Sequence, residues 1–527
     1  MSSGSAQLFF LFLLALGQAH KILVYQPKFA LSHVNFMGRI ADILVEEGHN
    51  VTVLVSEIQP MHDGTKRARI IRVPGGTAIE HTLMSGAVDM FEVEALNVPH
   101  VLSIAYLDGV WFSTQCRRLL TDPGLVEMLK EEKYDAFITE NFDCCGIGLS
   151  HLINAKSLIT LTSFPTNDRL LSDLGSPRFP SYDIGLFAPS TDSHSFWNRA
   201  YKQYIFFCSI EFLGKAVRMV QAVYDELYPG MPSISEIHSH AAVSFLNSAP
   251  LIDSAAPTLN KIVPIGGVAV NAPKPLEKKW LDILALRNRT AIVSFGSIAK
   301  SSNMKPIRKN SILNALAKFP DTTFIWKYEE LSDDFSKLNA SRVPNVILSD
   351  WMPQNDLLGD PRVALFITHG GIASCHEASH AGVPVIVVPI FCDQPRNADT
   401  LVQHGNGINF NKFDTVHEGK IADAIVSVLG DPSYSANAKK LAEQLRNAPI
   451  SPRTLLVKHV EYAARFGPSS TSRPAGLDLS YIEYFNVDIF AAFAVLVAIV
   501  LYVVFIIISS LVCMIIRIRP AQKEKKQ

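Results

Sequence analysis

Residues 351–394 read WMPQNDLLGDPRVALFITHGGIASCHEASHAGVPVIVVPIFCDQ. Within this stretch, residues 363–368 have the apolar, β-branched composition of a buried strand, and the two glycines at 370–371 form a turn. Residues 373–381 then predict a short helix, and a second strand begins at Val385. This pattern predicts a βαβ unit whose first helical N–H groups point into the crevice at the carboxyl end of the strand. Such a crevice accepts an anion, and a phosphate is the expected guest.

Polar side chains at one end of this unit favour a nucleotide over a bare phosphate. The indole of Trp351 can stack on a flat base. Gln354 offers an amide to a base or a ribose, and Glu377 can accept hydrogen bonds from ribose hydroxyls. Taken singly, each side chain fits an ordinary α/β core unit equally well, so the combination carries the interpretation.

The remaining polar residues extend the predicted site toward a sugar. His369, Gly371 and Ser374 flank the start of the helix, where a diphosphate would lie. Asp393 and Gln394 end the second strand as an acceptor and donor pair suited to sugar hydroxyls. The alternative without a ligand is that His369 is a core histidine and Ser374 a helix-capping serine. A nucleotide sugar is the ligand that uses all of these groups.

The run WMPQNDLL…ITHGG…EA…AGVP…DQ…NA resembles the signature of the UDP-glycosyltransferases, and in particular that of the animal UDP-glucuronosyltransferases. The resemblance extends from about His20 to the C-terminus. It implies an α/β fold of GT-B type, with two Rossmann-like domains facing a cleft. It also implies a UDP-sugar as co-substrate, no separate cofactor and no metal. Ala373 stands where the family usually has Asn or another small residue near the phosphates, which leaves the donor preference open.

The same resemblance assigns the catalytic residues. His33, in a predicted loop after the strand Lys21–Pro27, falls where the family keeps its general base. Glu140 stands where an Asp is expected, and Asp143 lies three residues downstream, both after the predicted strand 134–138. Either acid could reach the imidazole, so the partner of His33 is left open. Without the resemblance, a loop histidine and two loop acids would carry little weight.

Ser297 closes the predicted strand Ala291–Ser297 and resembles the serine with which the family contacts a phosphate. Arg396, just past the Asp-Gln pair, suggests a further hypothesis, in which its guanidinium meets the carboxylate of a uronate sugar.

Composition bounds the remaining possibilities. The chain has 527 residues, 48% of them hydrophobic and 18% charged, which indicates two or more globular domains. A net charge of -1 gives no reason to expect a nucleic-acid partner. Seven cysteines show no Cys-x-x-Cys spacing, which argues against a structural zinc site. Disulfide pairing is left open.

The chain divides into segments of distinct composition. Residues 195–228 form an aromatic-rich helical stretch that could line an acceptor pocket, rest on a bilayer or pack on the core of its own domain. The predicted segments are a signal peptide (1–19), an N-terminal acceptor-binding Rossmann-like domain (20–250), a linker (251–285), a C-terminal UDP-sugar-binding Rossmann-like domain (286–466), a hinge (467–488), a transmembrane helix (489–516) and a cytosolic tail (517–527).

The C-terminal region predicts a single-pass membrane protein with lumenal catalytic domains. Residues 489–516 carry no charge and would span roughly 42 Å as a helix. Basic residues follow at once, which places the tail in the cytosol. The ending KEKKQ resembles a dilysine retrieval signal of the endoplasmic reticulum. The sequons at Asn50, Asn288 and Asn339 are compatible with lumenal exposure.

The predicted activity is inverting transfer of a glycosyl group, glucuronosyl first and glucosyl second, to a hydroxyl or similar nucleophile of a small lipophilic acceptor. Two alternatives stay open. One is a non-catalytic lumenal protein of the same fold that binds UDP or a lipophile. The other is a glycosyltransferase that acts on lipid-linked or protein acceptors. Whether the chain forms a homo-oligomer is also open.

Overall fold

The computed structural model describes residues 19–58, 61–75, 90–94, 98–183, 185–187 and 192–521. They fall into two compact units, Met1–Ser472 and Arg473–Gln527. Residues 1–18 of the predicted signal peptide and the lysines of the KEKKQ ending lie outside the described residues.

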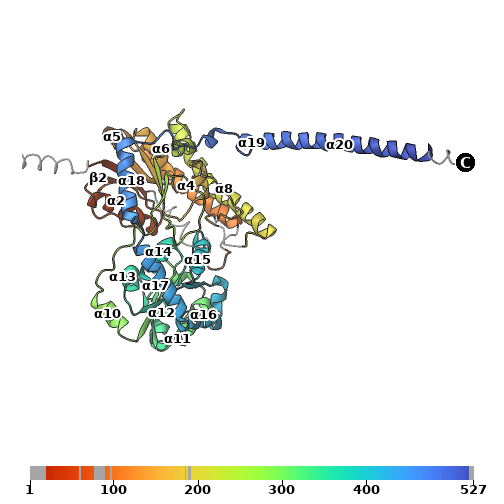
Figure 1. Cartoon of the computed structure of the whole chain (residues 1–527). Coiled ribbons are helices and arrows are strands. Elements are labelled where there is room, and N and C mark those ends of the chain that lie inside the picture. Colours follow the sequence, from red (N-terminus) through yellow and green to blue (C-terminus); the bar gives the residue numbers. More distant parts are fainter. Residues whose placement is uncertain are drawn as a thin grey trace, which may run out of the picture. The chain divides into compact units, whose positions relative to one another are not determined.

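A seven-stranded parallel sheet forms the core of the N-terminal half, in the order β3-β2-β1-β4-β5-β6-β7. Figure 1 shows β2 of this sheet beside α2. The strand order reverses between β1 and β4, so a crevice is expected at their carboxyl ends. The strands are β1 (Lys21–Pro27), β2 (Asn50–Ser56), β3 (Arg69–Val73), β4 (Ala136–Glu140), β5 (Leu158–Thr162), β6 (Val243–Leu246) and β7 (Ile262–Pro264).

A six-stranded parallel sheet forms the C-terminal half, in the order β10-β9-β8-β11-β12-β13. Its order reverses between β8 and β11, which repeats the logic of the first sheet. The strands are β8 (Arg289–Ser294), β9 (Thr322–Lys327), β10 (Val346–Ser349), β11 (Val363–Thr368), β12 (Val385–Val387) and β13 (Gly407–Asn409). The prediction of two Rossmann-like halves is confirmed.

Helices cover both sheets, as expected for doubly wound parallel sheets whose strands are apolar on both faces. Those of the first half are α2 (Leu31–Glu46), α4 (Val98–Thr121), α5 (Leu125–Glu131), α6 (Cys145–Leu152), α7 (Asp168–Asp173), α8 (Phe196–Leu227) and α9 (Ile234–Ser239). Those of the second half are α10 (Lys278–Leu284), α11 (Pro306–Ala317), α12 (Asp334–Arg342), α13 (Gln354–Leu358), α14 (Ile372–Ala381), α15 (Gln394–Gln403), α16 (Glu418–Gly430) and α17 (Pro432–Arg446), with short 3₁₀ turns at Ser301–Asn303 and Lys412–Val416.

The predicted loop around His33 is helical, which corrects the sequence analysis. Helix α2 begins at Leu31, so His33 lies in its first turn. No Pro or Gly interrupts residues 29–37, and Val34, Met37 and Ala41 continue one buried face. Helical periodicity therefore begins at Leu31, before His33 and not after it.

Helix α8 is one continuous helix of 32 residues that packs along α4. Its buried side chains, among them Phe212, Val220 and Tyr224, join the core of the first half, so the helix does pack on its own domain. Rings in its N-terminal part stay exposed, including Phe196 and Trp197. A disulfide between Cys116 and Cys145 ties α4 to α6.

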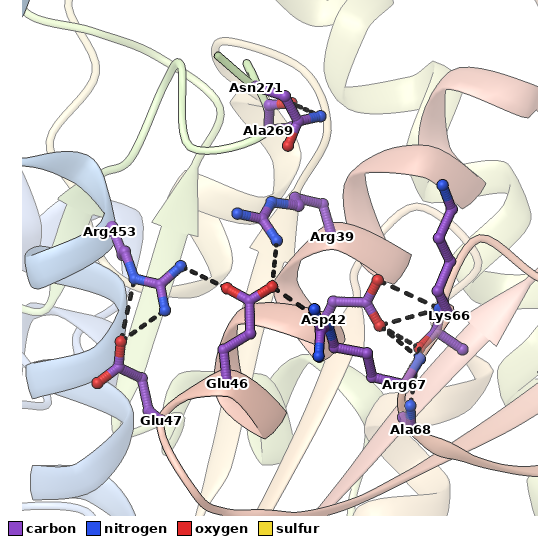
Figure 2. A network of polar contacts seen from close by, with 11 residues as sticks. Arg39, Asp42, Glu46, Glu47, Lys66, Arg67, Ala68, Ala269, Asn271 and Arg453 are labelled. Carbon is purple, nitrogen blue, oxygen red and sulfur yellow. Dashed lines mark hydrogen bonds and ion pairs between the residues drawn. The ribbon is translucent and has the colours of Figure 1, made fainter. Parts of the chain in front are cut away.

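Helix α18 (Pro452–Phe466) follows the second half in sequence but packs on the first sheet. Leu456, Val457 and Val460 are buried in the core that β1 and α2 help to form. At its start, Arg453 donates hydrogen bonds of 2.6 to 3.0 Å to Glu46 and Glu47 of α2 (Figure 2). These partly exposed ion pairs contribute little, so the apolar face stabilises the return of the chain. The chain therefore returns from the second half to the core of the first.

The second unit contains a short 3₁₀ turn (Ala475–Asp478), α19 (Tyr481–Tyr484) and α20 (Val487–Ala521). Within the described residues, α20 is the one helix that is long and apolar enough to cross a membrane, over Val487–Arg517. It encloses the predicted span 489–516.

The buried face of α18 should contribute to the stability of the protein. Leu456→Ala should lower the free energy of unfolding by about 2–5 kcal/mol, because a fully buried leucine leaves a cavity in the shared core. Tyr462→Ala, on the same helix but 63% exposed, is the control and should change it by less than about 0.5 kcal/mol. Urea unfolding of the detergent-solubilised protein measures both. Equal effects of the two changes would show that α18 does not belong to the core.

Candidate functional site

The catalytic histidine predicted from the sequence has one acidic partner, Glu140. Because β1 and β4 are adjacent, the residue that ends β4 faces the helix that follows β1. The His33 Nδ1 atom lies 2.6 Å from the Glu140 Oε1 atom, and both side chains are buried. A carboxylate only accepts, so Nδ1 donates and the Nε2 lone pair is left for a substrate proton. The backbone N–H of Ser163 also donates to Glu140, at 3.1 Å.

Asp143 has different partners. The Tyr25 hydroxyl donates to it at 2.7 Å, and the backbone N–H of Cys145 donates at 3.1 Å. Burial raises the pKa of Asp143 to about 7, although both of these hydrogen bonds lower it. Asp143 therefore ties β1 to the start of α6. Of the two acids that the sequence left open, the structure places Glu140 against His33.

Aromatic rings surround the imidazole. The ring centroids of Phe29, Phe164 and Phe142 lie 4.4, 5.1 and 5.9 Å from that of His33. Phe112 of α4 packs edge-on against Phe29 and Phe142. Such a wall excludes water from the base and is suited to an apolar ligand.

The predicted phosphate site lies at the start of α14 in the second half. Gly371 caps this helix without a side-chain hydrogen bond, so the first backbone N–H groups stay available for an anion. The His369 ring lies so close that a Cβ atom on Gly296 or on Gly371 would fall 2.6 Å from Nε2. Gly296 also has φ +87, which other residues rarely adopt. Burial lowers the pKa of His369 to about 4, so the ring is neutral near pH 7.

Residues expected to hold the nucleoside lie together beside this helix. The Gln354 amide donates to the Ser374 hydroxyl at 3.1 Å and to the Glu377 carboxylate at 2.5 Å. Burial raises the pKa of Glu377 to about 7. Trp351 is 63% exposed, so its ring is free to stack on a base. Ser297 is likewise exposed, in the loop after β8.

The predicted sugar-binding pair does not end the second strand, as the sequence suggested: β12 ends at Val387, and after a loop Asp393 caps α15 and Gln394 begins it. Asp393 is buried and accepts a hydrogen bond of 2.7 Å from Asn397. Burial raises the pKa of Asp393 to about 6, although the hydrogen bond from Asn397 and the charge of Arg396 lower it. Gln394 uses its amide oxygen to accept from the N–H groups of Ile390 and Phe391, at 2.8 and 3.0 Å, which leaves its NH₂ group for a ligand.

The family model described as "UDP-glucoronosyl and UDP-glucosyl transferase" matches residues 20–527. The chain belongs to this family. UDP-glucuronosyltransferase 1A9 of Mus musculus is 28% identical over 511 residues, which cover 95% of this chain and 93% of the mouse protein. UDP-glucuronosyltransferase 2B19 of Macaca fascicularis is 27% identical and covers 97% of each chain.

A solved structure shares the fold of this UDP-glycosyltransferase. The UDP-glucosyltransferase from Polygonum tinctorium has a TM-score of 0.58 at 16% identity, over 85% of this chain and 99% of that one. This likeness establishes the GT-B fold, in agreement with the two parallel sheets.

Arg396 does not have the role suggested from the sequence of this UDP-glycosyltransferase. Its guanidinium is 3% exposed and pairs with Asp253, in the segment that follows β6. The uronate hypothesis therefore loses its physical basis, because the cation already neutralises a carboxylate of the protein.

Two residues near the site were missed by the sequence analysis. Lys327 ends β9, donates to the Gly296 carbonyl at 2.6 Å and lowers the pKa of His369, so it adds positive charge beside the phosphate site. Asp108 of α4 has a pKa raised to about 7 by burial, and its charge raises that of Cys392, the neighbour of Asp393. A lysine at a strand end and a lone acid within an apolar helix were the available signals.

The raised pKa of Glu377 makes stability depend on pH in a defined direction. Between its ordinary value of 4.5 and about 7, the folded protein holds a proton that the unfolded chain releases. The contribution of this group to stability is therefore largest below that range and falls as the pH rises through it. In ligand-free protein, the melting temperature of Glu377→Gln relative to wild type should rise by a few degrees from pH 5 to pH 8.

Exposed Glu443 on α17 supplies the control, since Glu443→Gln should show no such trend. Thermal-shift series across the pH range give both differences, in which all other titrating groups cancel. A pH-independent difference for Glu377→Gln would contradict the raised pKa.

Proposed function

We propose that this UDP-glycosyltransferase is anchored in the membrane of the endoplasmic reticulum and transfers a glucuronosyl or glucosyl group, with inversion, to a small lipophilic acceptor. The observation that carries the proposal is the buried His33–Glu140 pair, in which 2.6 Å separate Nδ1 from Oε1. A protein that only binds UDP or a lipophile has no use for a base oriented in this way.

The reaction follows from the two sides of the site. An acceptor hydroxyl next to His33 Nε2 gives its proton to the imidazole as its oxygen attacks the anomeric carbon. The bond from that carbon to the diphosphate oxygen breaks with its electron pair on UDP, so attack comes from the face opposite UDP. Glu140 stabilises the imidazolium that forms, and Asp143 holds the loop between β4 and α6.

In this proposal, groups of the second half stabilise the negative charge that develops on UDP. The N–H groups at the start of α14 and the side chains of Ser297, Ser374 and Lys327 supply donors and positive potential there. His369, neutral near pH 7, donates or accepts without adding charge. Trp351, Gln354 and Glu377 hold the nucleoside in this assignment, while Asp393 and Gln394 hold the sugar.

The acceptor and donor classes rest on separate grounds. The phenylalanine wall around His33 favours an apolar acceptor over a polar one. Glucuronosyl transfer comes first because the mouse and macaque relatives bear the name UDP-glucuronosyltransferase. Glucosyl transfer is second, since the family covers both sugars.

The lumenal placement has support beyond the resemblance. The Cys116–Cys145 disulfide fits an oxidising compartment, and Asn288 of one sequon is exposed in the turn before β8. Together with the basic tail after α20, these features favour catalytic domains in the lumen.

The topology can be tested with sealed microsomes. Added protease should remove only the few residues after α20, because the bilayer shields the rest, and the size shift on a gel measures this. Detergent-opened vesicles serve as the control. Complete digestion in sealed vesicles would contradict lumenal placement.

The general base is tested by substitution. His33→Ala should lower kcat by about 10²–10⁴, because a positioned base contributes that much. Binding of UDP should stay unchanged, since its proposed contacts lie in the other half. His240→Ala, at an exposed site of the same half, is the matched control. An active His33→Ala enzyme would rule out the mechanism.

The same assay separates the two acids. Glu140→Gln should lose most of the kcat, because an amide does not stabilise the imidazolium. Asp143→Asn should retain more, because Asp143 contacts Tyr25 and Cys145 and not His33. The reverse order would assign Asp143 as the partner.

A further inference from the structure

A five-residue segment of the N-terminal half, residues 90–94, docks on the C-terminal half. Phe91 is 3% exposed and belongs to the hydrophobic core that β8 and β9 form. Its ring lies edge-on to Phe295, with 6.0 Å between centroids. This docked segment lies between β3 and α4 in the sequence, and α4 carries Phe112 of the aromatic wall.

Charged side chains hold the docked segment. Arg308 of α11 is 2% exposed, and it donates to the Glu92 carboxylate at 2.7 Å and to the Phe91 carbonyl at 3.3 Å. Lys305 pairs with Glu92 at 3.2 Å. These cations, Arg308 first, lower the pKa of Glu92.

The decisive contact is made by Lys412, in the 3₁₀ turn after β13. Its side chain is buried, with 4% exposed, and its ammonium group donates to the carbonyl oxygens of Met90, Val93 and Ile390. The distances to Met90 and Ile390 are 2.8 and 2.7 Å. An ammonium has three N–H donors, so one buried cation gathers three backbone carbonyls that come from both halves.

Ile390 belongs to the loop that ends at Asp393. Its N–H donates to Gln394 at 2.8 Å, while its carbonyl accepts from Lys412 at 2.7 Å. We propose that Lys412 is a positioning residue for sugar transfer: it fixes the loop bearing Asp393 and Gln394 relative to the docked segment of the acceptor-side half. Charge-assisted bonds in a buried site are strong enough to set a loop position, and a shift of about 1 Å at a reacting sugar can cost 10²-fold in rate.

This inference rests on the proposed role of Asp393 and Gln394 in holding the donor sugar. In full-length protein in membranes, Lys412→Met should raise the KM for the UDP-sugar or lower kcat, with kcat/KM falling by about 10-fold to 100-fold. Inhibition by UDP itself, which lacks the sugar, should change by less than about twofold. The methionine keeps the length of the side chain and removes only the charge and its donors.

Lys420→Met is the matched control, because Lys420 is a largely exposed lysine of α16 that pairs with Asp414. It should leave all constants unchanged. If Lys412→Met does not accumulate as folded protein, Glu92→Gln loosens the docked segment from its partly exposed edge and should raise the KM for the UDP-sugar in the same direction.

Unchanged UDP-sugar kinetics in folded Lys412→Met would overturn the inference. An equal loss of UDP-sugar turnover and of UDP inhibition would also overturn it, because that result means general damage to the second half. If wild-type protein transfers no sugar from any UDP-sugar, the proposed function fails as well, so the two failures are distinguishable.

Discussion

The hydrogen bond between His33 and Glu140 is the interaction on which the rest of the site depends. It forms because β1 and β4 are adjacent at the point where the strand order reverses, so the first turn after one strand meets the last residue of the other. A histidine at this place without the carboxylate would lack a fixed tautomer. The phenylalanine wall then keeps water away from the pair, which strengthens its electrostatics.

The second half contributes the predicted phosphate site. The start of α14 offers N–H groups, and glycines at 296 and 371 let the His369 ring approach closely. The two halves are held by contacts far apart in sequence, namely the apolar face of α18 on the first sheet and the docked segment 90–94 on the second. Geometry between base and donor thus depends on packing as well as on hydrogen bonds.

Those elements that depend on local sequence patterns could be predicted from the sequence. The strands at 21–27 and 363–368 appear with the predicted bounds, and α14 begins one residue earlier than predicted, because apolar runs bounded by glycines or turns define such elements closely. The helix around His33 was missed because the change from strand to helix carries no capping residue. The sequence could not decide whether Glu140 or Asp143 is the partner of His33, because side chains three positions apart at a strand end can point into different surroundings. The sequence also did not point to Lys327, Asp108 or Lys412, because their roles depend on contacts with residues distant in the chain.

The proposed reaction transfers the sugar of a UDP-sugar to a lipophilic hydroxyl by direct displacement at the anomeric carbon, with UDP as the leaving group. Membranes containing the protein should be incubated with UDP-glucuronate or UDP-glucose and a simple phenol, and the conjugate analysed by mass spectrometry and by NMR of its anomeric proton. The expected product is a phenol conjugate in which the α-linkage of the donor has become β. An α-linked conjugate would contradict a single displacement with inversion. Failure to form a conjugate with any UDP-sugar would contradict the proposed activity as a whole.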